Sequence, residues 1–415
     1  MSHMSENVRY RPDLNNYKAD VVIVGGGPAG MHLTHELRKR FGNGFRTLLL
    51  EQAEVLGGSG PASMQQLRTF QSNRAMVEMI VKTEQWYKQV SNETKAKLIS
   101  PLPYLFVAAD EQQLDQYNTT LEGVQKWGQG ENGTIWTPEE VRRYFPFVNK
   151  DVAGALYYPG AYQLDFSAAI NYITKDTPNA TFALGTPMAN VKIENGRVTG
   201  VDTPQGFVAT EKVVLATGPF AIKTGDKIVG GNLDEAAKLS ELIEVRKRQR
   251  FSAVVKEFPP HTKVFVISPG GQYVRLHTEK DGNGYGDYGY AASDDPTVSD
   301  PLINPKADEI EFPTVVYAGL GKAISAYGDE ERTGPLAIKP LPGSRVAGYY
   351  AETPDDLPVV CATSVPGLFL NVAHSHAGVM SMGAASHMTN IIDRGISPNN
   401  PFGIDRKFQH DGIRL

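Results

Sequence analysis

Cysteine is almost absent from this sequence of 415 residues, in which Cys361 is the only one. An intrachain disulfide, a CxxC redox pair and a cysteine zinc site are therefore excluded. Any oxidation–reduction chemistry must come from a bound cofactor, because the side chains cannot supply it. A single cysteine also fits a reducing compartment, so we expect a cytoplasmic protein.

Long apolar runs are also missing. No stretch approaches the roughly 18 consecutive apolar residues that a membrane span needs. The N-terminal segment is polar, so we expect no signal peptide, and its first letters, "MSHM", resemble a cloning remnant. The net charge of −5 and the isoelectric point of about 6.0 give no basic field. Nucleic acid and anionic membranes are therefore not expected as partners.

The rest of the composition is that of a soluble globular protein, with 41% hydrophobic and 21% charged residues. The length suggests roughly two to three domains.

The most informative segment is "DVVIVGGGPAGMHLTHELRKRFGNGFRTLLLEQ". An apolar run at 21–24 predicts a buried parallel strand, and Gly25, Gly27 and Gly30 then open a helical pattern. Gly25 suits a tight turn, Gly27 the close approach of a pyrophosphate, and Gly30 the packing of helix on strand. A second buried strand ends at Glu51, about 20 residues later, where an acid can bind a ribose. Together these features predict a dinucleotide site.

This fingerprint occurs once. The nearest second copy, "TVVYAGLGKAISAYG", has Gly319 and Gly321 but Ile324 at the third glycine position, and we interpret it as a plain turn. One dinucleotide site without redox cysteines favours FAD that the substrate reduces directly.

The middle of the chain contains further pieces of a nucleotide-binding fold. Asn195-Gly196 predicts a hairpin, and a buried strand leads into the small residues Ala216, Thr217 and Gly218. Between such pieces, residues 87–152 look helical and 221–339 alternate like antiparallel strands. We therefore expect a discontinuous cofactor domain at 19–86, 153–220 and 340–396, with a substrate domain at 87–152 and 221–339.

Near the C-terminus, "NVAHSHAGVMSMG" brings His374, Ser375 and His376 together. A metal pair lacks a nearby Asp, Glu or Cys, and Ser375 lacks a nucleophile elbow, so we expect no metal site and no serine nucleophile. A loop whose backbone passes a ligand remains, with either histidine as a hydrogen-bonding, proton-handling or purely structural group.

The segments "VVIVGGGPAG…LLLE", "VVLATGPFA", "AGYYAETPDDLPVV" and "AHSHAGVMSMG" together resemble the D-amino-acid oxidase and sarcosine oxidase superfamily of FAD enzymes, from Asp20 to about Gly395. The resemblance implies an α/β fold of the glutathione-reductase-like FAD class, with a Rossmann-type FAD-binding domain and an inserted antiparallel-sheet substrate domain. The C-terminal loop would pass the flavin ring. The implied FAD-binding residues are Gly25, Gly26, Gly27, Pro28, Ala29, Gly30, Glu51, Gln52, Ser59, Ala216, Thr217, Gly218, His376, Ala377, Gly378, Val379 and Met380.

Substrate residues follow the family only in part. Arg68 matches an arginine that sarcosine-oxidase-like members use for the substrate carboxylate. Tyr350 stands where amino-acid oxidases have an arginine, and Met380 where sarcosine oxidases have a lysine. Gly348 replaces the cysteine that binds flavin covalently, so we expect non-covalent FAD. Asp287 aligns with a lysine that promotes reaction with oxygen, which would favour a dehydrogenase.

The function expected from this resemblance is oxidation of a C–N bond of an amine or amino acid by hydride transfer to FAD, with a secondary or tertiary amine or a larger amine-bearing metabolite left open as the substrate. Arg68, Tyr350, His374 and His376 are the candidate catalytic residues. The electron acceptor, oxygen or another compound, and the oligomeric state stay open. The alternatives are an FAD monooxygenase, whose "GD"-type motif before the last helix is missing from "NVAHSHAG", and a flavin-binding module that has lost its activity.

Overall fold

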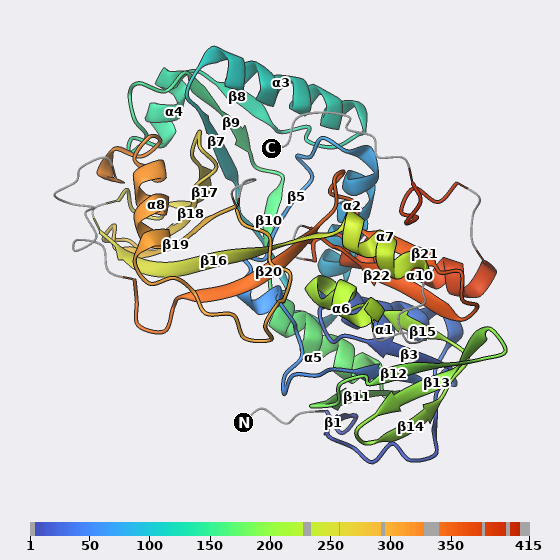
Figure 1. Ribbon diagram of the computed structural model, residues 1–415. Coiled ribbons are helices and arrows are strands. Elements are labelled where there is room, and N and C mark those ends of the chain that lie inside the picture. The colour runs from blue at the N-terminus through green and yellow to red at the C-terminus, as the bar shows by residue number, and fades with distance from the viewer. Residues whose placement is uncertain are drawn as a thin grey trace.

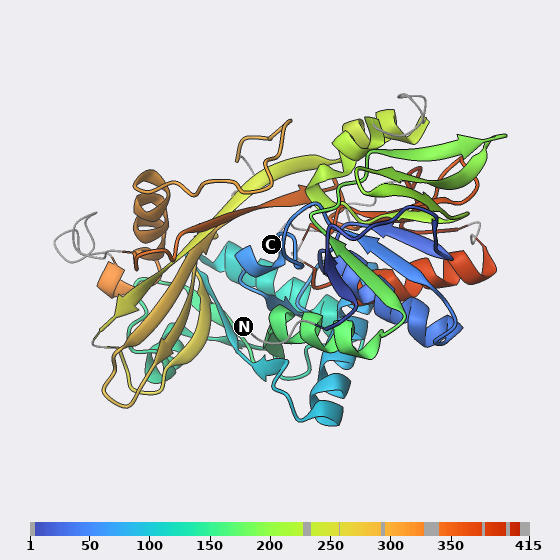
Figure 2. The same cartoon turned by 90° about the horizontal axis from the view of Figure 1, so that it is seen from below.

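The computed structural model describes residues 5–226, 234–256, 258–291, 295–327, 340–375, 378–395 and 399–406. Two lobes share the chain, and the long strands β16 (Glu244–Val255) and β20 (Val346–Glu352) run from one lobe toward the other (Figure 1). The same strands form the longest ribbons when the molecule is viewed from below (Figure 2).

One lobe is built on a seven-stranded sheet. Its order is β1 (Val8–Tyr10), β11 (Ala180–Leu184), β4 (Thr47–Leu50), β3 (Val21–Val24), β15 (Val213–Leu215), β22 (Leu368–Val372) and β21 (Val359–Ala362). All neighbours are parallel except β21 and β22. The central strands are buried throughout, as expected for a sheet covered on both faces.

Helices and a small sheet cover the two faces of this sheet. One face packs on α1 (Pro28–Phe41), α2 (Arg74–Thr94), α5 (Phe166–Asp176) and α10 (Ser381–Arg394), whose buried residues share one apolar cluster. The other face packs on a four-stranded sheet, β12 (Asn190–Glu194), β13 (Arg197–Thr203), β14 (Gly206–Ala209) and β2 (Tyr17–Lys18). The hairpin predicted at Asn195-Gly196 joins β12 to β13, and both residues have positive φ.

The second lobe is an eight-stranded sheet. Its order is β20, β16, β19 (Gly284–Tyr290), β18 (Tyr273–Thr278), β17 (Lys263–Ile267), β7 (Tyr104–Ala108), β9 (Gly154–Tyr158) and β8 (Thr134–Trp136). Its strands are antiparallel except the pair β7 and β17. The antiparallel sheet expected beside the dinucleotide fold is thus confirmed. Strands β9 and β20, which the expected ranges assigned to the cofactor domain, pair within this sheet.

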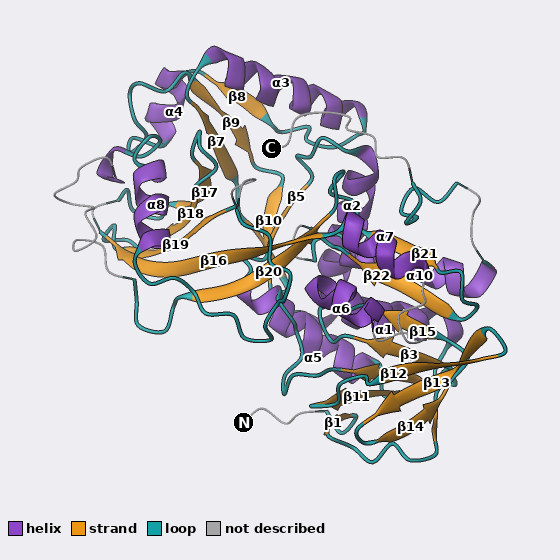
Figure 3. Ribbon diagram, in the orientation of Figure 1, coloured by secondary structure: helices purple, strands orange, loops and turns teal. Residues whose placement is uncertain are grey.

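Shorter elements complete the fold. They are the sheet β5 (Gln66–Arg68), β10 (Ala161–Leu164) and β6 (Ile99–Pro101), the helices α3 (Glu111–Lys126), α4 (Pro138–Tyr144), α6 (Ala221–Asp226), α7 (Asp234–Leu242) and α8 (Glu311–Leu320), and the 3-10 turns η1 (Gly60–Ala62), η2 (Gly218–Phe220) and η4 (Ser325–Tyr327). Helices α3 and α4 lie at the outer end of the second lobe, near β7, β8 and β9 (Figure 3). Helix α4 begins at Pro138 with a capping box between Thr137 and Glu140.

The two faces of the eight-stranded sheet differ in chemistry. One face is apolar, for example at Phe251 and Tyr288, and packs on α8 and α4. Since directly paired residues of antiparallel strands share a face, the register places Tyr350 with the arginines of β16 and with Asp287 and Arg275 on the opposite face. This polar and aromatic face is turned toward the cofactor lobe through the segment at 59–64.

Candidate functional site

A cavity of about 550 Å³ begins at the carboxyl ends of β3, β4 and β15 and extends to β20. In an α/β sheet, ligands bind at this end of the parallel strands. Thirteen of the expected site residues line it: Gly25, Gly27, Pro28, Ala29, Glu51, Gln52, Ser59, Ala216, Thr217, Gly218, Tyr350, His374 and Gly378. Residues of five separate chain segments therefore meet at one cavity.

The glycines of the first turn have separate roles. Gly25 has φ of +113°, and a Cβ there would lie 2.3 Å from the carbonyl oxygen of Ala216. A Cβ at Gly30 would lie 2.0 Å from the carbonyl oxygen of Gly25, so Gly30 lets helix α1 pack on its strand. At Gly27 the nearest atom to a Cβ is 3.9 Å away. The space beside Gly27 is therefore open to a ligand, whereas the space beside the other two is filled by protein.

Glu51 is buried, with 7% of its surface exposed. Its carboxylate accepts hydrogen bonds from the backbone N–H of Gly26 at 2.7 Å and of Ala53 at 2.8 Å. Burial raises the pKa of Glu51, and these backbone donors oppose that shift. Gly26 does not line the cavity, and its role is to hold the acid that does.

The hydroxyl group of Thr217 is buried at the cavity without a hydrogen-bond partner among the described residues. A buried hydroxyl without a partner loses the hydrogen bonds it makes in water, so native structures usually satisfy it. The open space at Gly27, the free N–H groups at the start of α1 and this hydroxyl fit the diphosphate and sugar of a dinucleotide.

The C-terminal loop approaches the same cavity. A Cβ at Gly378, whose φ is +84°, would lie 2.7 Å from Cβ of Pro28, so the small residue permits a close approach of the loop to α1. Helix α10 begins three residues later, at Ser381. His376 and Ala377 lie outside the described residues, and their assignments stay predictions.

His374 lines the cavity as an uncharged imidazole. Its Nε2 lies 2.9 Å from Oδ1 of Asn371, and because an amide oxygen only accepts, Nε2 carries the proton. Nδ1 is then an acceptor, and it is buried without a partner among the described residues. Burial lowers the pKa of His374 to about 4.

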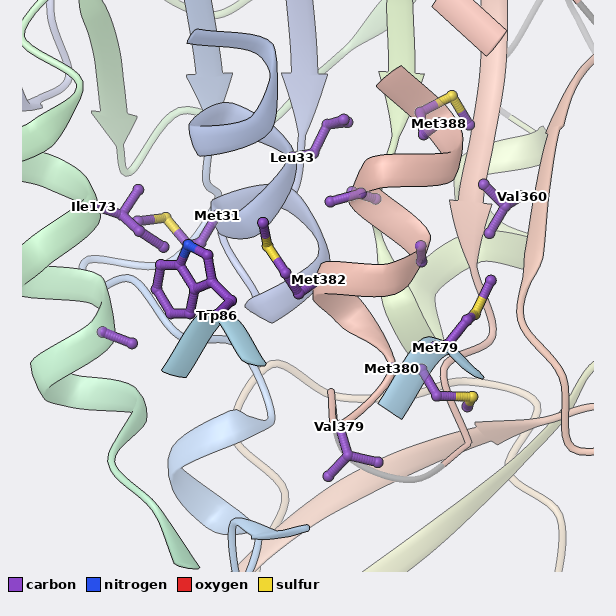
Figure 4. Packing of buried hydrophobic residues seen from close by; sticks show 14 of the residues in the cluster. Met31, Leu33, Met79, Trp86, Ile173, Val360, Val379, Met380, Met382 and Met388 are labelled. Atoms are coloured by element: carbon purple, nitrogen blue, oxygen red, sulfur yellow. The ribbon is translucent and has the colours of Figure 1, made fainter. Parts of the chain in front are cut away.

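Val379 and Met380 were expected to bind the cofactor, but neither of them lines the cavity. Both side chains are buried in the apolar cluster between α1, α2 and α10 (Figure 4). The loop turns into α10 at this point, so these side chains face the core and not the ligand space. Only the backbone groups of Val379 and Met380 could therefore make the predicted contact with the cofactor.

Arg68 lies at the end of β5, beyond the cavity lining. Its guanidinium lies over the rings of Tyr104 and Phe106, 5.9 and 5.4 Å from their centroids, and donates to the carbonyl of Phe70. No carboxylate of the described residues lies within 4.0 Å of it. Burial lowers the pKa of Arg68, and the neighbouring tyrosines oppose that shift.

Tyr350 is a buried phenol at the cavity, and the charge of Arg68 influences it. It lines the cavity from β20, and the guanidinium of Arg248 lies 5.5 Å from its ring centroid. Burial raises the pKa of Tyr350, while the charges of Arg248 and Arg68 oppose that shift. Arg248 is itself paired with Glu352 at 2.7 Å and with Asp295. The phenol is therefore protonated at neutral pH and can donate a hydrogen bond.

Two other expectations concern charge and attachment. Cys361 is buried on β21, in the apolar cluster between the seven-stranded and the four-stranded sheet, which fits non-covalent cofactor binding. Asp287 does not leave a lone negative charge, because Arg275 holds its carboxylate at 2.5 Å and Arg250 lies 4.0 Å away. The expected alignment of Asp287 with the lysine that promotes reaction with oxygen, and the dehydrogenase that it would favour, stay predictions.

Several lining residues were not expected. Gly58, Gly60 and Ala62 belong to the glycine-rich segment after Glu51, and that richness could have indicated them. Leu302, Ile303, Asn304, Pro305 and Arg345 line the outer end of the cavity and carry no comparable sequence signal.

The described part of the chain contains no group of three or more His, Cys, Asp or Glu side chains that could hold a metal ion. None of its helices is both long and apolar enough for a membrane crossing. The segment around Gly319 and Gly321 forms α8 and its C-terminal turn, so the second glycine motif is not a nucleotide site.

The FAD dependent oxidoreductase family model matches residues 20–390, and the chain belongs to this family. Sarcosine oxidase subunit beta of Rhizobium meliloti (strain 1021) is 25% identical over 397 residues, covering 91% of this chain and 85% of the relative. Mitochondrial dimethylglycine dehydrogenase of Rattus norvegicus is 25% identical over 276 residues, covering 65% of this chain.

The match to dimethylglycine dehydrogenase spans only 31% of the rat enzyme's length. Among solved structures, L-proline dehydrogenase from P. horikoshii superposes with a TM-score of 0.75 at 22% identity, covering 94% of this chain and 97% of that chain. This likeness confirms the fold. The chain thus belongs to the family of FAD-dependent oxidoreductases, and the residues at its cavity fit the cofactor.

Proposed function

We propose that this oxidoreductase oxidises the C–N bond of a small amine or amino acid that carries a carboxylate. The single observation that supports a carboxylate on the substrate is the environment of Arg68. Its guanidinium is partly buried and has no acidic partner among the described residues. Such a cation is expensive to desolvate unless an anion joins it, and a bidentate carboxylate matches its geometry. The proposal also follows the relatives, whose names denote amine and amino-acid enzymes.

Each predicted substrate residue has a distinct task in this scheme. Arg68 binds the substrate carboxylate, and Tyr350 donates a hydrogen bond from the cavity side. FAD, when bound, accepts a hydride from the carbon that bears the nitrogen. The nitrogen must be uncharged for that transfer, because an ammonium has no lone pair to assist the loss of hydride.

We infer that His374 favours binding of the amine in its uncharged form by accepting a hydrogen bond, and that the amine gives up its proton to water before it binds. Nδ1 of His374 is an acceptor because Asn371 holds the proton on Nε2. With a pKa of about 4, the imidazole is neutral over the whole physiological range. It can therefore accept a hydrogen bond from the substrate amine or from the cofactor, but a neutral-pH imidazolium is excluded.

The predicted domains fit this division of tasks. We propose that the segments at 19–86, 153–220 and 340–396 hold FAD, and that 87–152 and 221–339 form the substrate side together with β9 and β20. Non-covalent FAD and a cytoplasmic location remain part of the proposal, supported by Gly348 and by the single cysteine.

An anaerobic titration tests the reaction. The purified protein is loaded with FAD, and N-methyl amino acids, α-amino acids and amines without a carboxylate are added without oxygen. Loss of absorbance near 450 nm, about where oxidised flavin absorbs, with the carboxylate-bearing amines is the expected result. Reduction by NADPH alone would favour a monooxygenase. Absence of reduction by every amine would favour a flavin-binding module.

A further inference from the structure

Asp287, in the middle of β19, organises a group of charged side chains on the polar face of the eight-stranded sheet. Its Oδ2 accepts hydrogen bonds from Nε and Nη2 of Arg275 at 2.9 and 2.5 Å. Its Oδ1 accepts from the hydroxyl of Ser252, and Nη1 of Arg250 lies 4.0 Å from the same oxygen. The carboxylate therefore fixes the orientation of a planar guanidinium through two of its donors.

The two arginines reach from this sheet to the segment that lines the cofactor cavity. Nε of Arg250 donates to the carbonyl oxygen of Ala62 at 3.1 Å. Nη1 of Arg275 donates to the carbonyl oxygen of Met64 at 3.4 Å. Ala62 lines the cavity, as do Ser59 and Gly60 on the same turn. Contacts from the second lobe thus end on the backbone of the cofactor lobe.

The cavity segment needs such contacts, because little regular structure holds it. Its only helical element is the three-residue turn η1, and Gly58 before it has φ of +52°. The side chains of Arg250, Arg275 and Asp287 are each about one-fifth exposed, at 21%, 19% and 19%. Hydrogen bonds to charged groups in such partly buried places are stronger than those on an open surface.

We propose that Asp287 is a positioning residue that holds the Ala62–Met64 backbone in place through Arg250 and Arg275. It thereby sets the width of the cavity between the turn at 59–62 and Gly348. An ideal Cβ at Gly348 would lie 3.2 Å from Cβ of Ala62, so the two segments are already in close contact. The proposal requires only that FAD occupies the cavity. It does not depend on which substrate is oxidised.

The test compares Asp287→Asn with Asp202→Asn in the full-length protein. Both changes remove the charge of an aspartate that pairs with a basic side chain on a β-strand. Asp202 pairs with Lys192 at 3.1 Å in the four-stranded sheet, and neither residue lines the cavity. We expect the FAD dissociation constant of Asp287→Asn to rise at least fivefold, with displaced flavin absorption bands. Asp202→Asn should retain the wild-type values.

Thermal unfolding with and without FAD separates positioning from general destabilisation. A positioning role reduces the stabilisation that FAD adds, whereas a purely structural role lowers the Tm of both forms equally. Arg275→Met should have the same effect, and the double variant should be no worse than either single one, since the two residues act as a unit. Arg275→Lys keeps the charge but loses the second donor, so its FAD dissociation constant should lie between those of the wild type and Arg275→Met. This variant replaces Asp287→Asn in the test if Asp287→Asn does not fold.

Unchanged FAD affinity in Asp287→Asn, or strictly additive effects of the two substitutions, would overturn the proposal. The substrate proposal is tested separately by the bleaching of the wild-type protein. A wild type that no amine reduces, combined with weakened FAD binding in Asp287→Asn, would refute the substrate assignment and leave this inference intact.

Discussion

The backbone N–H of Gly26 donates to the carboxylate of Glu51 over 2.7 Å, across 25 residues of sequence. This bond joins the glycine turn after β3 to the acid after β4. It also removes one N–H from the set that could bind a phosphate, and Pro28 has none to offer. The N–H groups of Gly27, Ala29 and Gly30, near the start of α1, would therefore be the ones to bind the diphosphate.

Gly27→Val should abolish FAD binding without unfolding the protein. A Cβ at this position meets no protein atom closer than 3.9 Å, so the new side chain enters the ligand space. We expect at least a 100-fold rise in the dissociation constant, or about 3 kcal/mol. Titration of the purified apoprotein with FAD measures this.

Gly30→Ala provides the contrast for that substitution. Its methyl group would lie 2.0 Å from a backbone oxygen, so the free energy of unfolding should fall by about 1–3 kcal/mol even without FAD. A Gly27→Val protein that binds FAD as the wild type does would show that the diphosphate lies elsewhere.

Thr217→Val should weaken FAD binding and leave the apoprotein at least as stable. The buried Oγ1 has no partner among the described residues, so its replacement by a methyl group removes an unmet polar atom. The lost hydrogen bond to the cofactor should cost about 1 kcal/mol, or roughly fivefold in affinity. Calorimetric titration with FAD and urea unfolding of the apoprotein give the two values. A loss of apoprotein stability greater than the loss of affinity would argue for a structural hydroxyl.

Arg68→Gln should reduce kcat/KM for carboxylate-bearing amines by about 2–4 kcal/mol of transition-state binding. Amines without a carboxylate should be affected much less, because they form no ion pair with the guanidinium that the substitution could remove. Arg68→Lys keeps the charge but not the paired donors, and should lie between the two. Equal losses on both substrate classes would indicate that Arg68 only supports the fold.

Acid should destabilise the protein through His32. This residue is 2% exposed on α1, and its Nδ1 lies 2.8 Å from the hydroxyl of Ser381. Burial, with a smaller contribution from His35, lowers its pKa from 6.5 to about 3. The unfolded state therefore takes up a proton below pH 6.5 that the folded state refuses. The associated stability is complete above pH 6.5 and is lost as the pH falls toward 3.

One pH unit below the unfolded value, this histidine should account for about 1.4 kcal/mol of lost stability. Urea unfolding at pH 7.5 and at about pH 5.5 measures the loss. In His32→Asn, whose amide can still donate to Ser381, the difference between the two pH values should shrink by that amount. An unchanged pH dependence would mean that other groups carry it.

Sequence and structure agree best where the evidence is local. Strand, glycine spacing, helix and acid follow one another within residues 21–51, and each is dictated by backbone geometry over a few positions. The hairpin at Asn195-Gly196 is local in the same way. His374 and Gly378 of the C-terminal motif line the cavity, whereas the side chains of Val379 and Met380 are buried in the core, because residue order does not reveal which way a side chain faces as α10 begins.

By itself, the amino-acid order of this protein determined the dinucleotide turn, the alternation of buried and exposed residues along its antiparallel strands, and the family to which it belongs. These follow from short-range steric and hydrogen-bonding rules. Only the tertiary structure decided that Arg68 lies over the rings of Tyr104 and Phe106, that Tyr350 lines the cavity, and that Asp287 pairs with Arg275. Such partners come from separate strands, and they meet only when sheet register and the packing of two lobes bring them to the same face.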